Sequence, residues 1–314
     1  MRIFTGYRKS AAFFVASFLG LPGFVLAQGS DAAPESPVVL APSSAWALEY
    51  SDDSCRVARS FGEGEQLTVL HMTQFEPDHS FMLAVAGGGL DRNIRADRAQ
   101  IQFGPVHERL TEKEPHPGTI GKFAPGLIFA DISVRQTELP KPSSRRKDQA
   151  RIANFVPVDP ITPEDEAKVE WIEIAVRDQP HVRLATGPMG DLFTSLNTCS
   201  EELLTHWGLD LERHRTISRK VVPKQSPAQW ISTNDYPSEA WRRGEQAIVY
   251  FRLMVDESGR PYSCYIQQSG YSAGFDEAVC NSMMRRARFE PALDGEGKPI
   301  KSYFRTAVRF DIPH

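Results

Sequence analysis

The stretch that most constrains the fold is a near-continuous apolar run over residues 246–255. Alternate residues from Val249 to Val255 are apolar, and so are most of the residues between them. A strand that is apolar on both faces lies at the centre of a sheet or under a covering layer. Residues 256–259 then predict a hairpin loop, with Gly259 in the left-handed conformation. The run is therefore expected to form a central strand of an antiparallel sheet.

Four further elements surround this strand in the last quarter of the chain. A short helix is expected over residues 236–244, with Pro237 in its first turn and Gly244 at its end. A partner strand follows over residues 262–268, then a helix with Ser272 as N-cap, and finally a strand over residues 300–311. These elements predict a small α+β domain with a three-stranded antiparallel sheet and two helices.

This order of elements resembles the C-terminal domain of TonB-type energy transducers. The matching residues are Tyr236-Pro237 with Ala240, Gly259, Ser269-Gly270, Phe275-Asp276 with Ala278, Arg288-Phe289 with Pro291, Gly297-Lys298-Pro299, Val308 and Phe310. Each motif alone is weak, whereas their order and spacing together are specific. The remainder of the chain resembles only loosely the accessory regions of exported proteins that carry such a domain.

The resemblance implies a binding function rather than catalysis. Domains of this family bind a short segment of an outer-membrane receptor, which adds as a strand beside the last strand of the sheet. In this chain that strand covers residues 300–311. The implied partner-binding residues are Lys301, Tyr303, Arg305, Ala307 and Arg309. A second interpretation stays open, in which the charges on this strand only protect an exposed edge from aggregation.

The N-terminus predicts export. Arg2, Arg8 and Lys9 precede an uncharged apolar stretch, and small residues then place signal-peptide cleavage after Ala27. The predicted location is the periplasm, with membrane attachment only if the segment stays uncleaved as an anchor. The apolar stretch is short for a span, and residues 22–23 (Pro-Gly) interrupt it. It also lacks the histidine through which full-length transducers couple to a proton-driven motor.

The four cysteines predict two disulfide bonds after export. Of the three possible pairings, Cys264–Cys280 and Cys55–Cys199 place one bridge inside each expected domain. Cys264 shares a strand face with Ile266, and that face meets Cys280 if it looks towards the helix. Two buried free thiols are the alternative for this pair.

The first two thirds of the chain predict a β-rich domain, either a small sandwich or a partly closed barrel. Candidate strands cover residues 47–50, 56–61, 66–75, 80–86, 101–103, 127–134 and 169–175. Residues 188–206 change to helical periodicity, so a helix is expected to close this domain with Cys199 on its buried face. Residues 140–151 have the composition of an exposed loop. A full-length transducer carries a proline-rich spacer where this domain stands.

The predicted organisation has five parts. They are a signal peptide (1–27), a flexible leader (28–44), a β-rich domain with its helix (45–212), a linker (213–235) and the TonB-like domain (236–314). Order is expected to begin near Trp46.

No enzyme motif, cofactor motif or metal-ligand pair is evident. Residues 87–89 (Gly-Gly-Gly) lack the Lys-Ser/Thr of a phosphate loop. The net charge of −4 becomes more negative without the signal region, which argues against nucleic-acid binding. The expected function is strand-addition binding of an outer-membrane receptor peptide or another envelope protein. The alternatives are a membrane-anchored energy transducer and a hydrolase in the N-terminal domain.

Overall fold

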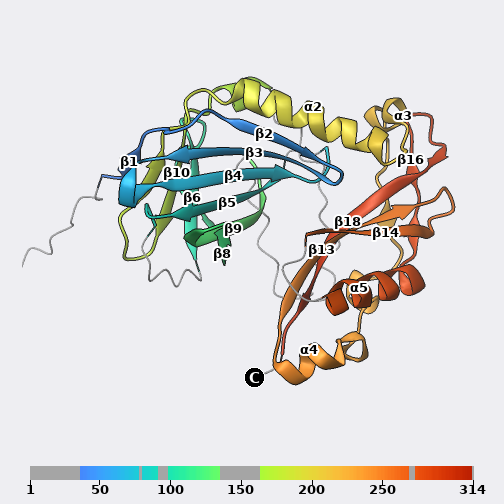
Figure 1. Cartoon of the computed structure of the whole chain (residues 1–314). Coiled ribbons are helices and arrows are strands. Elements are labelled where there is room, and N and C mark those ends of the chain that lie inside the picture. The colour runs from blue at the N-terminus through green and yellow to red at the C-terminus, as the bar shows by residue number, and fades with distance from the viewer. Residues whose placement is uncertain (1–35, 78–79, 91–97, 135–162, 269–272, 313–314) are drawn as a thin grey trace, which may run out of the picture. The chain divides into compact units, whose positions relative to one another are not determined.

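The N-terminal domain consists of two β-sheets (Figure 1). The computed structural model describes residues 36–77, 80–90, 98–134, 163–268 and 273–312. One sheet has the order β2 (Ala47–Ser51), β3 (Ser54–Phe61), β4 (Thr68–Gln74), β5 (Phe81–Gly87), β9 (Phe123–Ile132), β8 (His116–Ile120). The other has the order β1 (Val38–Leu40), β11 (Val182–Leu184), β10 (Trp171–Val176), β6 (Ala99–Gly104), β7 (Thr111–Lys113). The α+β class is therefore confirmed, and this part of the chain is strand-rich.

The two sheets share one hydrophobic core, and helix α2 (Gly190–His206) contributes to it. Phe81 of the first sheet packs against Phe103 of the second and against Phe193 of α2. Cys55 and Cys199 are buried and joined by a disulfide bond, which fastens α2 to β3. The short helix α1 (Pro163–Ala167) packs on α2. The Cys55–Cys199 disulfide is the pairing preferred from the sequence.

Every strand expected in this domain is present, but four short strands were missed. Three of them are β7, β8 and β11. The fourth, β1, lies inside the segment expected to be a flexible leader and pairs in parallel with β11. Regular structure thus begins before Trp46, because residues 38–40 pair with β11 and Leu40 is buried in the core. The expected exposed loop at residues 140–151 lies outside the described residues.

The C-terminal domain contains a three-stranded sheet with the order β14 (Pro261–Gln268), β13 (Ala247–Val255), β18 (Ser302–Phe310). All pairs are antiparallel and the apolar run forms the central strand, as predicted. Helix α5 (Ala273–Arg286) covers one face, where Phe251 and Phe275 are buried. The short helix α4 (Ser238–Arg243) ends at left-handed Gly244.

The β13–β14 hairpin requires glycine at position 259. Gly259 has φ +79°, and a Cβ there would lie 1.9 Å from the carbonyl oxygen of Phe289. Any larger residue would displace the short strand β15 (Phe289–Glu290) that follows α5. Cys264 of β14 forms a disulfide bond with Cys280 of α5, so this face of β14 looks towards the helix.

Residues 213–235, the expected linker between the domains, are packed on the C-terminal domain. This segment includes most of α3 (Leu211–Arg215), all of β12 (Val222–Pro223) and two single turns. Strand β12 pairs with β15, and Trp230 is fully buried against Phe289 and Phe304. The segment shows no periodicity because single large side chains, rather than one continuous face, attach it to the core.

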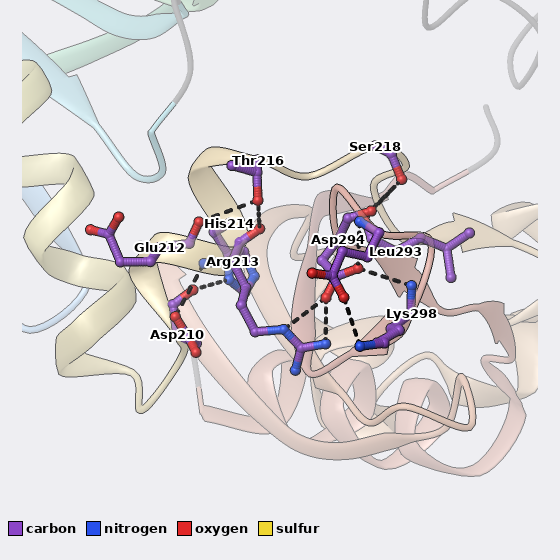
Figure 2. Close-up of polar contacts among 10 residues, drawn as sticks. Asp210, Glu212, Arg213, His214, Thr216, Ser218, Leu293, Asp294 and Lys298 are labelled. Carbon is purple, nitrogen blue, oxygen red and sulfur yellow. Dashed lines mark hydrogen bonds and ion pairs between the residues drawn. The ribbon is translucent and has the colours of Figure 1, made fainter.

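A polar joint holds the start of this segment (Figure 2). The Arg213 guanidinium donates to Asp294 Oδ2 from Nε at 2.9 Å and from Nη2 at 2.6 Å. Asp294 lies in the loop between β16 (Ala292–Leu293) and β17 (Pro299–Ile300), where its Oδ1 accepts from the Lys298 amide. Asp210 caps α3 by accepting from the Arg213 amide at 3.1 Å. Main-chain and side-chain contacts therefore both fix the segment in place.

Candidate partner-binding edge

Strand β18 lies at an edge of the C-terminal sheet. It pairs with β13 from Ser302 to Phe310 without any register shift, and no other described strand pairs with it. An edge strand presents a row of backbone N–H and C=O groups to whatever lies beside it. A regular edge of this length is a suitable template for an added strand.

The direction of the backbone groups in β18 follows from the β13–β14 hairpin. The Asp256 amide donates to the Arg260 carbonyl at 2.9 Å, so the backbone groups of Asp256 point towards β14. Successive residues of a strand point their backbone groups to opposite sides, so those of Val255 and every second residue before it point towards β18. In β18 the partners of these residues, such as Ser302 and Val308, face inwards. The outward groups belong to Tyr303, Arg305, Ala307 and Arg309.

Strand β14 forms the opposite edge of the same sheet and is less regular. Its pairing with β13 shifts register twice, and it begins with Pro261, which has no N–H. Bulges and proline are features that block strand addition. Of the two edges, β18 therefore presents the better template.

The five residues expected at the partner-binding edge fall into two groups. Lys301, Ala307 and Arg309 are exposed, and Arg309 pairs with Asp311 at 2.8 Å. Tyr303 and Arg305 instead contact the N-terminal domain. The Tyr303 ring packs edge-on against Trp207, which follows α2, with 5.3 Å between ring centroids.

Arg305 makes the second of these contacts between the domains. Its guanidinium lies 3.5 Å from the Glu76 carboxylate and 4.6 Å from the centre of the Phe75 ring. Its Nε also donates to Gln267 of β14 at 3.0 Å. Only 13% of the Arg305 side chain is exposed, so its charge is largely committed within the protein.

A third contact, which the sequence analysis missed, is centred on Arg252 of β13. Its side chain is 2% exposed, and its guanidinium lies 3.6 Å from the centre of the Trp207 ring and 4.7 Å from that of Tyr265. Nη1 donates to Asp53, in the β2–β3 turn, at 2.6 Å. The only sequence signal was a single charge inside an apolar run. This charge identifies the sheet face opposite α5 as a docking face for the N-terminal domain.

One buried carboxylate lies away from this interface. Glu166 of α1 is 5% exposed, and Asn197 of α2 donates to it at 3.4 Å. Burial raises the pKa of Glu166 to about 7, and the hydrogen bond opposes this only partly. Among the described residues, no group of three His, Cys, Asp or Glu side chains is placed to hold a metal ion.

The glycines at positions 87–89 have a packing role. A Cβ on Gly88 would lie 1.6 Å from the Glu65 carbonyl oxygen, and one on Gly87 would lie 2.2 Å from that of Leu67. The glycines thus allow β5 to end against the chain entering β4. Within the described parts of the chain, no helix is both long and apolar enough to cross a membrane.

The C-terminal sheet and the helices packed on it form a small α+β domain, with β18 at one edge of the sheet. Residues 232–312 match the family described as Gram-negative bacterial TonB protein C-terminal. The C-terminal quarter of the chain therefore carries a TonB-like domain, as its motifs predicted. This family is associated with envelope transport and is not enzymatic. No curated protein matches the chain significantly.

Proposed function

We propose that this protein is a periplasmic binding protein, which takes up an extended segment of an outer-membrane receptor or another envelope protein by strand addition to β18. Two facts support the proposal. The TonB-like domain belongs to a family that acts with such partners. Its β18 edge is regular and presents the outward backbone groups of four residues, Tyr303 to Arg309.

The regularity of β18 is the observation that carries the proposal. Strand addition obtains its affinity from main-chain hydrogen bonds, so it requires a row of correctly spaced donors and acceptors. Strand β14 lacks such a row because of its two register shifts and Pro261. The side chain of Ala307, in the second half of β18, is small and exposed, so it also leaves room for an incoming chain.

Substitution of one outward backbone donor tests this function. Ala307→Pro removes the N–H at position 307, and because this group points away from β13 the pairing with Tyr250 is expected to survive. Binding of fluorescein-labelled peptides from the periplasm-facing segments of outer-membrane receptors is expected to weaken at least about tenfold in fluorescence anisotropy, since one hydrogen bond is lost.

Ala307→Val is the matched control because it adds bulk at the same position and retains the N–H. It is expected to bind the peptides within about threefold of the unmodified protein, since no backbone hydrogen bond is lost. Circular dichroism and thermal unfolding establish that both variants are folded. Equal affinity of a folded Ala307→Pro variant and the unmodified protein would show that β18 does not accept a strand.

A further inference from the structure

A small pocket lies where the N-terminal domain meets the outer face of the C-terminal sheet. It has room for about one water-sized group. The ends of β4 and β9 and the start of β5 form one side, and Tyr250 and Arg305 form the other. Tyr250 belongs to β13 and Arg305 to the edge strand β18, so the pocket lies over these two neighbouring strands.

The first carboxylate of the pocket, Glu76, is neutralised within the protein. It lies 3.5 Å from Arg305, and the two side chains are 18% and 13% exposed. Such a shielded pair contributes little net charge to its surroundings. The charge of the pocket therefore depends on its second carboxylate.

That second carboxylate belongs to Asp131, at an irregularity of β9. An extra residue interrupts the pairing of β9 with β5 between Phe129 and Ile132, and bulges of this kind redirect a side chain. Asp131 is exposed and forms none of the ion pairs found among the described residues, and its charge interacts at longer range with that of Lys113. Burial and the Asp131 charge both raise the pKa of Tyr250, because the two side chains are close. The pocket thus combines a carboxylate and an aromatic ring, which together suit a cation.

The position of the pocket relates it to a strand added at β18. Such a strand lies about 4.8 Å from β18, and every second side chain of it points to the same sheet face as Arg305. Tyr250 and Arg305, which line the pocket, lie on this face. A long side chain of the added strand, placed level with Arg305 and Ala307, extends over the same sheet face as the pocket that Asp131 lines.

We propose that the pocket receives a lysine side chain from the strand that adds to β18, with its ammonium group between Asp131 and Tyr250. This inference rests on the function proposed above and adds the chemistry of the partner. An ammonium group is about the size of a water molecule and fits the available space, whereas the planar guanidinium of arginine is larger. The N-terminal domain thus selects the partner that the C-terminal sheet binds.

Selection of peptides on the immobilised full-length protein tests the proposal. A phage-displayed library of random ten-residue peptides is selected in parallel on the unmodified protein, on Asp131→Asn and on Ala307→Pro. Binders to the unmodified protein are expected to contain lysine at one fixed position of an alternating strand pattern. Replacing that lysine by norleucine in a synthetic binder is expected to weaken binding about fivefold, as for a partly exposed ion pair.

Asp178→Asn is the matched control, because Asp178 (φ +59°) shares with Asp131 (φ +49°) a positive φ and does not line the pocket. The lysine preference should survive in this variant and disappear in Asp131→Asn. Binders that depend on Ala307 but show no lysine preference would overturn the pocket assignment and leave strand addition intact. An absence of binders, or binders unaffected by Ala307→Pro, would overturn both proposals.

Discussion

Single charged side chains have large consequences where they are buried. Arg252 occupies the docking face between Trp207 and Tyr265 and has Asp53 as its one carboxylate partner. Removing one member of a buried ion pair leaves the other without compensation, and this costs more than the pair itself contributes. The contact between the two domains is therefore sensitive to one substitution in the β2–β3 turn.

Asp53→Asn is expected to lower the free energy of unfolding by about 2–3 kcal/mol, because it leaves the Arg252 charge without its carboxylate. Chemical denaturation followed by circular dichroism measures this loss. The adjacent Asp52→Asn is the control: 92% of the Asp52 side chain is exposed, so a change below about 0.5 kcal/mol is expected. Equal effects of the two substitutions would contradict the role given to Arg252.

Glu166 gives the protein a pH-dependent stability. Its pKa is about 7 in the folded protein and 4.5 as the ordinary value, so the folded state binds the proton more tightly. The stabilisation that protonated Glu166 gives the folded state is fully present below pH 4.5, and it is lost as the pH rises through about 7. Relative to Glu166→Gln, the unmodified protein is expected to lose about 3 kcal/mol across this interval.

Thermal unfolding of both proteins between pH 4.5 and 8 measures the difference. Glu164→Gln, on the exposed side of the same short helix, should follow the unmodified protein. Parallel pH profiles for the unmodified protein and Glu166→Gln would mean that Glu166 titrates normally.

At the scale of secondary structure, sequence periodicity predicted the long elements and missed the short ones. Strand β13 was predicted because it is apolar on both faces, and helix α2 because its apolar residues recur with helical spacing. Three-residue strands such as β1 and β11 carry no measurable period, and their pairing depends on distant segments. The β18 edge was located through the family resemblance. The contacts of Tyr303 and Arg305 were missed, because no local pattern reveals which domain covers a sheet face.

The segment before the matched family region illustrates the same limit. Trp230 is fully buried, whereas Trp241 on α4 is 50% exposed. Trp230→Ala is expected to lower the free energy of unfolding by about 3–5 kcal/mol, through the cavity left beside Phe289 and Phe304. Trp241→Ala should cost less than about 1 kcal/mol. Urea unfolding monitored by circular dichroism distinguishes the two, and a small effect at Trp230 would contradict the packing of this segment on the domain core.

At the scale of the whole molecule, residues 36–314 form one compact unit. Tyr303, Arg305 and Arg252 connect the C-terminal sheet to Trp207, Glu76 and Asp53 of the N-terminal domain. A partner that binds β18 therefore meets a surface built from both domains. The domain boundaries assigned from the sequence remain proposals.

Cleavage of the N-terminal segment decides whether the protein is free in the periplasm. The protein recovered from an envelope fraction is expected to begin at Gln28, which Edman degradation or intact-mass measurement establishes. A start at Met1 together with membrane association would favour the anchored-transducer alternative instead.

The Cys55–Cys199 bond has a topological consequence. It joins two cysteines that are 144 positions apart in the sequence, and the covalent ring contains nearly all of β3 and the whole of strands β4 to β11. A protease that cuts the chain once inside this ring opens it without releasing either fragment. The nicked protein stays a single molecule under oxidising conditions and separates into two chains only after reduction. A single proteolytic cut in a loop of the N-terminal domain would thus leave the TonB-like domain covalently attached to that domain.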